Sequence, residues 1–243
     1  SGYLPASIQF VFTNRDPGEA EGSDQFQALV HSYGLPLVTL SSQRFRRERG
    51  ARSFDHVREE FDRQAIHRLE AFEPDLCVLA GYMLYTGPEL CRRFTMINLH
   101  PALPTGPIGT WQEVIWQLIE QRATETGAMI HLATEEWDRG PAITYFSFPI
   151  RGQTFDPLWE QAAGRTADDL KATYGEELPL FQRIREEGAK REQPLLVETI
   201  RAIALGKVKV AGRRVTDAQG RAIAPALCAG CTGAATGATV GAA

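Results

Sequence analysis

The sequence predicts an α/β protein with a doubly wound, mostly parallel β-sheet. β-rich runs alternate with helical patterns along residues 7–150, the order typical of β-α-β units. Residues 75–81 form a nearly continuous apolar run, as expected of a central parallel strand that is buried on both faces. Residues 53–72 place apolar side chains on one side of a long helix. Together these patterns indicate a sheet covered by helices.

The elements are expected to begin with a strand at residues 7–14 and a helix at residues 23–34, which Gly34 ends. A turn-prone run rich in Gly, Pro and acidic residues separates the two. The later elements expected up to residue 150 are a strand at 35–40, a helix at 53–72, a strand at 75–81, a helix at 88–94, a strand at 96–100, a helix at 110–121 and strands at 128–133 and 142–150.

The last third of the sequence is less patterned. Residues 168–205 are helical in composition, and we expect Pro179 and Pro194 to interrupt them. Residues 207–220 are typical of a small hairpin, and from Ala222 onward nearly all residues are Ala, Gly, Thr or Cys. We therefore expect one catalytic domain over residues 1–216 and a low-complexity, disordered tail over residues 217–243.

The composition excludes several classes of protein. Hydrophobic residues make up 43% and charged residues 23% of the 243 residues, which is ordinary for a globular protein. The net charge of -4 argues against a nucleic-acid binder, and no apolar run approaches the roughly 20 residues that span a bilayer. We therefore expect a cytoplasmic protein without nucleic-acid or membrane partners. Cys228 and Cys231 form a C-x-x-C pair without the further ligands of a zinc site, so no bound metal is expected.

The strongest local signal is the run INLHPALP at residues 97–104. Asn98 and His100 are two residues apart on a predicted strand, so their side chains share one face. The prolines that follow stop the strand, which places an amide and an imidazole at its carboxyl end. Ligands of doubly wound sheets bind at that edge. Taken alone, the pattern is more typical of an Asn that fixes a loop and a His that is satisfied in the core.

Asp138 lies in a predicted loop between two strands, where an aspartate commonly forms an Asx-turn. Three motifs occur in order: Asn-Leu-His-Pro at residues 98–101, Thr-Gly-Ala-Met-Ile-His at 126–131 and Asp-Arg-Gly-Pro at 138–141. With these motifs the sequence resembles the folate-dependent formyltransferase family over about residues 8–210. The order and number of the motifs make the resemblance specific.

The resemblance implies transfer of a formyl group from 10-formyltetrahydrofolate to an amine. Attack of the amine on the formyl carbon builds a tetrahedral intermediate, whose oxyanion needs preorganised hydrogen-bond donors. The amide of Asn98 and a protonated His100 are expected to supply them. Asp138 is expected to raise the pKa of His100 and to accept the proton of the amine. This chemistry needs no metal.

The resemblance also implies a folate site made of two loop segments and one arginine. Arg58 matches a family arginine that contacts the cofactor, although a solvated helix face explains it equally well. His131 lies inside a predicted strand and is expected to be structural. The predicted cofactor-binding residues are Arg58, Met83, Leu84, Tyr85, Thr86, Asn98, Thr134, Glu135, Glu136, Trp137 and Asp138.

Three departures from the family concern the acceptor amine. The family's first β-α unit, with its Gly-rich phosphate loop, has no counterpart in the sequence, and the loop after His100 is shorter than the family's. Residues 189–194, AKREQP, replace a family segment that helps to bind a ribonucleotide. Glu187 and Glu192 are the candidate substitutes for its substrate-binding residues.

The leading acceptor implied by the resemblance is glycinamide ribonucleotide, a phosphorylated small molecule of purine biosynthesis. Alternatives of the same class are transfer to another amine, such as an amino sugar or methionyl-tRNA, and hydrolysis of formyltetrahydrofolate. A non-catalytic folate-binding module is the alternative of a different class. The missing phosphate loop favours that module, whereas the presence of Asn98, His100 and Asp138 argues against it.

Overall fold

A computed structural model describes residues 3–136, 138–228 and 231 of the chain. The described residues divide into two compact units. The N-terminal unit comprises residues 5–97 and 133–136, and the C-terminal unit comprises residues 3–4, 98–132, 138–228 and 231. The boundary between the units falls inside one strand, β4 (Met96–His100), after Ile97.

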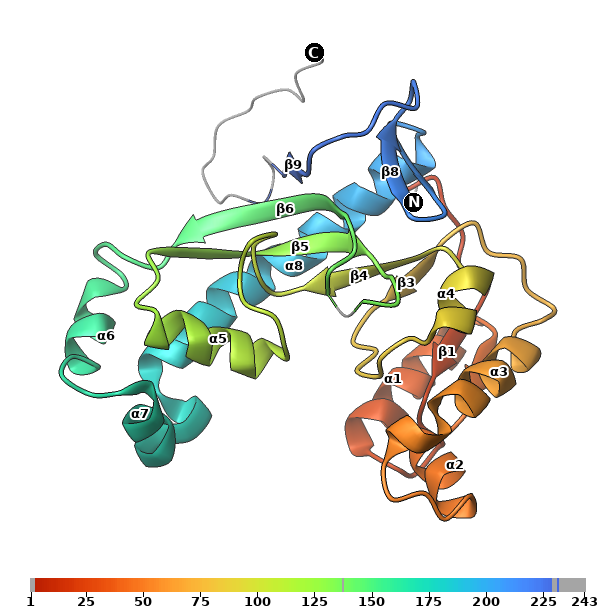
Figure 1. The fold of residues 1–243 in the computed structure, drawn as a ribbon, viewed down its shortest axis with the longest axis horizontal. Helices are drawn as coiled ribbons and strands as arrows, with labels where there is room; N and C mark the ends of the chain where they lie inside the picture. The colour runs from red at the N-terminus through yellow and green to blue at the C-terminus, as the bar shows by residue number, and fades with distance from the viewer. Residues whose placement is uncertain (1–2, 137, 229–230, 232–243) are drawn as a thin grey trace. The chain divides into compact units, whose positions relative to one another are not determined.

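The N-terminal unit begins with two short parallel strands, β1 (Val11–Thr13) and β2 (Leu37–Thr39), in which Val11 lies opposite Leu37. Helix α1 (Glu21–Ser32) connects them, as the sequence predicts (Figure 1). The remaining elements of this unit besides the start of β4 are α2 (Ser42–Glu48), the 3-10 helix η1 (Phe54–Val57), α3 (Arg58–Arg68), β3 (Cys77–Leu79) and α4 (Pro88–Arg93).

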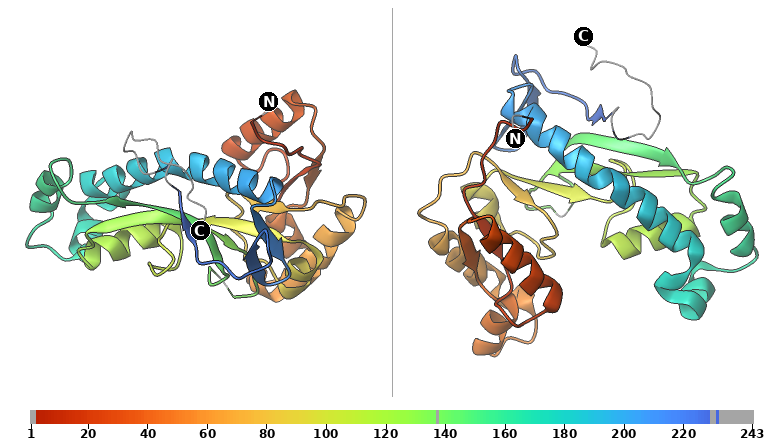
Figure 2. Two further views of the ribbon diagram at one scale, coloured as in Figure 1. Left: turned by 90° about the horizontal axis from the view of Figure 1, so that it is seen from above. Right: turned by 180° about the vertical axis from the view of Figure 1, so that it is seen from behind.

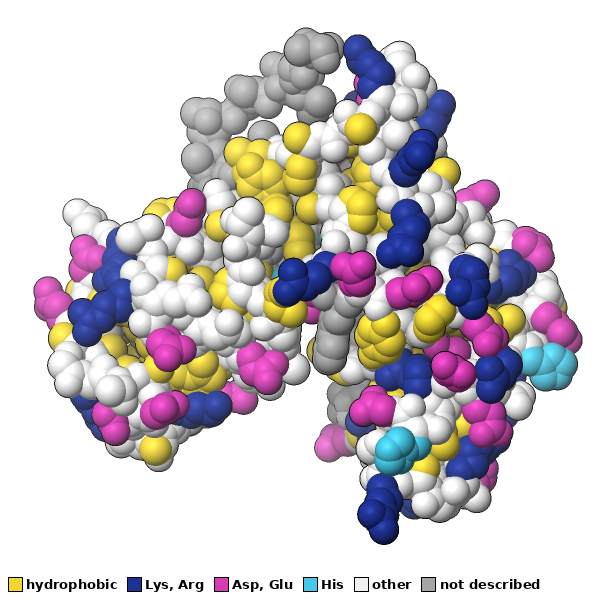
Figure 3. Space-filling view, viewed as in Figure 1, with side chains coloured by type: hydrophobic (Ala, Val, Ile, Leu, Met, Phe, Trp, Pro, Cys, Tyr) yellow, Lys and Arg dark blue, Asp and Glu magenta, His cyan; other side chains and the backbone are white. Residues whose placement is uncertain are grey.

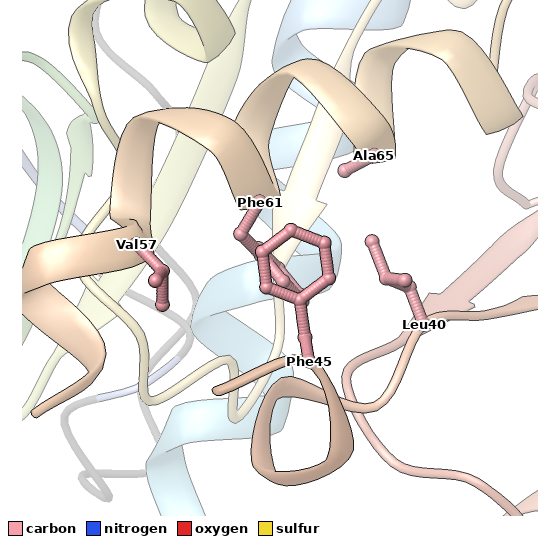
Figure 4. Close-up of a cluster of buried hydrophobic side chains, with 5 residues drawn as sticks. All are labelled: Leu40, Phe45, Val57, Phe61 and Ala65. Carbon is pink, nitrogen blue, oxygen red and sulfur yellow. The ribbon is translucent and has the colours of Figure 1, made fainter. Parts of the chain in front are cut away.

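One core of the N-terminal unit is the cluster Leu40, Phe45, Val57, Phe61 and Ala65, drawn in Figure 4. Phe61 is completely buried, and its ring meets that of Phe45 edge-on with centroids 5.2 Å apart. The apolar side predicted for the long helix therefore does face a core. The helix is not one element, however, because Val57, which ends η1 and is the N-cap of α3, has φ of -122° and ψ of 7°.

The main sheet has the strand order β3-β4-β5-β6-β9. Its later strands are β5 (Glu125–Leu132), β6 (Ala142–Pro149) and β9 (Ala226–Leu227). β5 and β6 are antiparallel, whereas β6 and β9 are parallel. The result is a mixed, mostly parallel sheet with flanking helices, which confirms the predicted fold class. β3, predicted to be central and buried on both faces, instead stands at one end of this order, and its residues are only half-buried.

One long helix of the C-terminal unit, α8 (Pro179–Ala204), lies along β5 and β6 (Figures 1 and 2). Pro179 opens α8, as expected, but α8 continues through Pro194, so the predicted interruption there is wrong. Proline removes one backbone hydrogen bond from a helix, and we attribute the continuity of α8 to its packing against β5 and β6. The other helices of this unit are α5 (Trp111–Glu120), α6 (Asp156–Gln161), α7 (Ala167–Tyr174) and the 3-10 helix η2 (Gly175–Glu177).

The predicted hairpin is confirmed as β7 (Val208–Ala211) and β8 (Arg214–Asp217). The expected low-complexity tail is described as far as Cys228, and this part contains β9. There the Cys228 N–H donates to the Tyr145 carbonyl oxygen at 2.7 Å. Apart from Cys231, the rest of the expected tail lies outside the described residues, and its disorder stays a prediction.

Acidic and basic side chains are interspersed on the face of the molecule shown in Figure 3. This mixture agrees with the small net charge of the sequence. Within the described residues, no helix is long and apolar enough to cross a membrane.

Candidate active site

Four polar side chains of the C-terminal unit form one group, which we call the His–Asp cluster: Asn98, His100, His131 and Asp138. Asn98 and His100 lie on the last three residues of β4, and His131 lies on the neighbouring strand β5. His100, His131 and Asp138 are all more than nine-tenths buried, and Asn98 is half-buried. The shared face predicted from the two-residue spacing therefore becomes a buried polar site.

Asp138 contacts all three other members of the cluster. Its Oδ2 lies 3.4 Å from His100 Nδ1, and its Oδ1 lies 3.5 Å from His131 Nε2. The Asn98 amide also donates to Oδ1 at 3.4 Å. The backbone of Asp138 has φ of 52°, in the left-handed region that costs most residues energy but is tolerated best by Asn and Asp. The structure thus brings together the three residues predicted to be catalytic.

His131 is the member of the cluster that the sequence analysis assigned to a structural role. Its Nδ1 lies 3.1 Å from the Leu132 carbonyl oxygen, to which a ring N–H donates. Its Nε2 is then free to accept from the Asn98 amide at 3.2 Å. The signal that points to this position is the end of the 126–131 motif, because strand alternation alone does not reveal that β5 lies beside β4.

Burial lowers the pKa of His100 and outweighs the influences that raise it. The Pro107 carbonyl and the Asp138 carboxylate favour the protonated ring, whereas His131 opposes it. This direction favours the neutral ring in the free protein, and the protonated His100 expected from the sequence stays a prediction. The sequence revealed Asp138, which favours the protonated imidazole, but it did not reveal how deeply His100 is buried.

The Nε2 atom of His100 also has a partner. It lies 2.9 Å from the carbonyl oxygen of Pro107, in the proline-rich loop of residues 101–109. An N–H at Nε2 donates to that oxygen, so Nδ1 is the ring atom that faces Asp138. Both ring nitrogens of His100 are thus engaged.

The surroundings of Gly127 explain why the second motif has a glycine at this position. A Cβ atom at this position would lie 1.8 Å from the Phe146 carbonyl oxygen and 2.8 Å from Leu103 Cδ2. Glycine therefore lets β5 and β6 pair closely beneath the loop that follows His100. The glycine of this motif thus permits the pairing of β5 with β6, and His131 lies on β5.

The two predicted cofactor segments meet within the N-terminal unit. The Tyr85 hydroxyl donates to the Glu135 carbonyl oxygen, and Arg92 lies 3.9 Å from the Glu135 carboxylate. Thr86 is buried, whereas Met83 is 70% exposed. Leu84 packs against the core cluster of this unit, and the hydroxyl of Thr134 donates to the Glu136 carbonyl oxygen. Trp137 lies outside the described residues.

Arg58 is not on a solvated helix face. It is 8% exposed, and its guanidinium lies over the rings of Phe54 and Tyr85, at 4.9 Å and 5.1 Å from their centroids. Its Nε and Nη1 are buried and have no hydrogen-bond partner among the described residues. This geometry favours the predicted cofactor contact over the surface interpretation.

The two candidate acceptor residues differ in their surroundings on α8. Glu187 lies 2.7 Å from Lys190 and 2.9 Å from Arg191, which lower its pKa to about 2. Glu192 lies 2.5 Å from Arg185 and lines a cavity of about 20 Å³ that Pro101, Thr126 and Gly127 also line. Only Glu192 thus lines this cavity next to the loop that follows His100.

Comparison with known proteins shows which family this chain matches. Residues 4–160 match the profile of a protein family described as formyl transferase. Phosphoribosylglycinamide formyltransferase of Escherichia coli is 32% identical over 173 residues, which cover 70% of this chain and 67% of that protein. The crystal structure of glycinamide ribonucleotide transformylase 1 from Symbiobacterium toebii superposes with a TM-score of 0.60 and 25% identity, over 89% of this chain and 82% of that one.

A second kind of relative also matches. Formyltetrahydrofolate deformylase of Escherichia coli is 28% identical over 122 residues, which cover 49% of this chain and 39% of that protein. The fold and these matches indicate an enzyme that handles a folate-bound formyl group. This chain belongs to the formyl transferase family, whose members use formyltetrahydrofolate, and it is a folate-dependent formyltransferase.

Proposed function

We propose that this enzyme transfers the formyl group of 10-formyltetrahydrofolate to the amine of glycinamide ribonucleotide. The observation that carries the proposal is the His–Asp cluster at the carboxyl end of β4, where Asn98, His100 and Asp138 converge. The relatives from E. coli and S. toebii, which are named for this reaction, support the choice of acceptor.

A neutral His100 fits this reaction as a general base. Attack of the amine forms the new N–C bond, sends the carbonyl electrons to oxygen and leaves a proton to be removed from nitrogen. The ring nitrogen that accepts this proton becomes part of a cation, which Asp138 stabilises from 3.4 Å. The same proton then moves to the folate nitrogen as its bond to the formyl carbon breaks.

Asn98 is the proposed donor to the oxyanion. Its two amide hydrogens point to His131 Nε2 at 3.2 Å and to Asp138 Oδ1 at 3.4 Å. The contact with Asp138 is the longer and therefore the weaker of the two. An oxyanion that replaces this contact would find a donor already oriented by His131, and one such donor typically contributes a factor of about 100 to 1,000 in rate.

Before His100 can accept a proton through Nε2, the loop of residues 101–109 has to shift and the ring proton has to move to Nδ1, which faces Asp138. The Pro107 carbonyl oxygen occupies the hydrogen-bonding direction of that atom at 2.9 Å. Binding of an acceptor beside Pro101 and Glu192, which line the same small cavity, is the proposed trigger for the shift. In this proposal the Pro107 contact keeps Nε2 of His100 from reacting until the acceptor arrives.

Hydrolysis of formyltetrahydrofolate is the second candidate function. It is favoured by the similarity to the E. coli deformylase and by the ion pairs that already occupy Glu187 and Glu192. In that case water takes the place of the amine at the same cluster. The membership of an enzyme family argues against a non-catalytic folate-binding module.

The fate of an isotopically labelled formyl carbon separates the two functions. The enzyme is incubated with labelled 10-formyltetrahydrofolate, with and without glycinamide ribonucleotide. We expect the label in the formylated ribonucleotide, with turnover that depends on the acceptor. Label recovered as formate at the same rate with and without the acceptor would contradict the proposal and establish the hydrolase.

A further inference from the structure

A buried carboxylate in the N-terminal unit lies outside the predicted sites. Asp62, on α3, is 1% exposed, and its Oδ2 accepts the Gly87 N–H at 2.7 Å. Its Oδ1 is buried without a hydrogen-bond partner among the described residues. Asp62 stands four residues after Arg58, so both side chains lie on the same face of α3.

Gly87 is the junction between the predicted folate loop and the helix that follows it. It comes directly after Thr86 and is the N-cap of α4, where it has no side chain to cap the helix. With only six residues, α4 is too short to be stable by itself, and its first amides need partners from elsewhere. Asp62 supplies one, so it fixes the point at which the loop ends.

We propose that Asp62 is a positioning residue for the folate loop of residues 83–86, acting through the Gly87 amide. The inference rests on the proposed function, because it takes this loop to be the cofactor site. Other contacts hold the loop elsewhere: the Tyr85 hydroxyl donates to Glu135, and Cys91 Sγ lies 3.6 Å from Thr86 Oγ1. Among the described contacts at the end of the loop, the one that the Gly87 N–H donates to the Asp62 carboxylate is charge-assisted.

The glycine at position 87 supports this inference. Its φ of -77° is open to any residue, so backbone conformation does not require glycine. A Cβ atom there would instead lie 2.4 Å from Asp62 Oδ2. Gly87 and Asp62 therefore form a matched pair, in which the missing side chain lets the carboxylate reach the amide.

The electrostatic setting of Asp62 is costly, as is typical of a residue retained for function. Burial raises its pKa to about 6, against the Gly87 hydrogen bond and Arg58, which lower it. Glu89 on α4 and Glu59 on α3 raise it further. An apolar side chain would avoid this cost but would leave the Gly87 amide without its partner.

The first test compares Asp62→Ala with Asp62→Asn, using 5-formyltetrahydrofolate as a stable probe and titration calorimetry as the measurement. The alanine removes the acceptor, and we expect a Kd at least about tenfold higher. The asparagine keeps an oxygen that accepts the Gly87 N–H, so its Kd should stay within about twofold of wild type. The control, Glu59→Ala, removes an exposed carboxylate from the same helix and should bind as wild type does. Equal affinity of Asp62→Ala and wild type would overturn the inference.

A second variant covers the case in which Asp62→Ala fails to fold. In Gly87→Ala the new Cβ displaces the carboxylate, and we expect the same loss of affinity with the melting temperature largely kept. Wild-type affinity of Gly87→Ala would then overturn the inference.

Hydrogen exchange at the Gly87 amide separates failure of the inference from failure of the proposed function. We expect this amide to be protected in wild type and in Asp62→Asn, and to exchange faster in Asp62→Ala. If wild type does not bind the probe, the proposed function fails, and protection that depends on Asp62 still establishes the anchor. An unprotected amide in wild type would overturn it.

Discussion

The two buried polar groups of this enzyme are built in opposite ways. In the C-terminal unit, the side chains of the His–Asp cluster pair with one another, and none of their polar atoms is both buried and without a partner. In the N-terminal unit, Arg58 and Asp62 leave buried nitrogen and oxygen atoms without partners among the described residues. Unsatisfied buried polar groups are costly, so they are kept where a ligand completes them. We propose that the first group serves the reaction and the second serves ligand binding.

In both groups, burial shifts the pKa of one residue in the direction that favours its neutral form. It lowers the pKa of His100 and raises that of Asp62 to about 6. The consequences differ. A neutral imidazole can act as a base, whereas the carboxylate of Asp62 is destabilised by burial and depends on the hydrogen bond from the Gly87 N–H. The comparison can therefore be tested by changing one group at a time.

The largest effect on stability is expected from Gly127→Ala, which disturbs the pairing of β5 and β6 next to the His–Asp cluster. The new Cβ would overlap the Phe146 carbonyl oxygen, so β5 and β6 must separate at a cost on the order of 3 kcal/mol or more. Chemical denaturation should show this loss of stability. Gly188→Ala is the control, because its nearest neighbour would be Glu192 at 3.9 Å, and a helical alanine should instead stabilise α8 slightly. Equal stability of both variants would mean that close pairing at Gly127 is dispensable.

Loss of the base or of its partner should abolish most of the activity. We expect His100→Ala and Asp138→Asn each to lower formyl transfer by at least about 100-fold, because both act on the transition state. Folate binding should persist in both, since the cofactor segments of the N-terminal unit are untouched and asparagine keeps the size and shape of the side chain at position 138. Steady-state kinetics and calorimetry measure the two properties, with the exposed His31→Ala as control. Near-normal turnover of either variant would remove its catalytic assignment.

His131→Ala should have a smaller effect, because this residue orients the cluster without a direct role in the reaction. Loss of its Nε2 leaves the Asn98 amide with one partner fewer, and we expect kcat to fall on the order of tenfold. The KM for folate should change little. A loss as large as that of His100→Ala would assign His131 a direct part in the chemistry.

Asp62→Asn should change how stability depends on pH. The folded-state pKa of about 6 lies above the ordinary value of 3.8, so the folded protein keeps a proton that the unfolded chain releases in this window. Asp62 therefore costs stability as the pH rises from 3.8 to about 6, and asparagine does not. The melting temperature of Asp62→Asn relative to wild type should rise by a few degrees across this window and then level off. A constant difference would show that Asp62 does not titrate there.

Much of the candidate catalytic site could be predicted from the sequence, because strand alternation and ordered motifs report local geometry. The predicted strand at residues 96–100 coincides with β4, and the spacing of Asn98 and His100 gives their common face. The protonation of His100 could not be predicted, because it depends on burial by the whole C-terminal unit. Asp62 belongs to no motif, and its role depends on the approach of α3 to Gly87.

The course of α8 through Pro194 was also beyond sequence analysis. Local propensity predicts a break at a proline, whereas packing along β5 and β6 keeps the helix continuous. The contact between His131 and Asn98 depends in the same way on which strands are neighbours.

The central claim is that His100 and Asp138 act as one catalytic unit, and a double-variant cycle tests it most directly. Formyl transfer is measured for His100→Ala, Asp138→Asn and the combination of the two. If the aspartate works by stabilising the protonated imidazole, its removal matters little once the imidazole is gone, and the double variant should be about as slow as the His100→Ala variant. A double variant whose loss equals the product of the two single losses would contradict the account, because the two residues would then act independently.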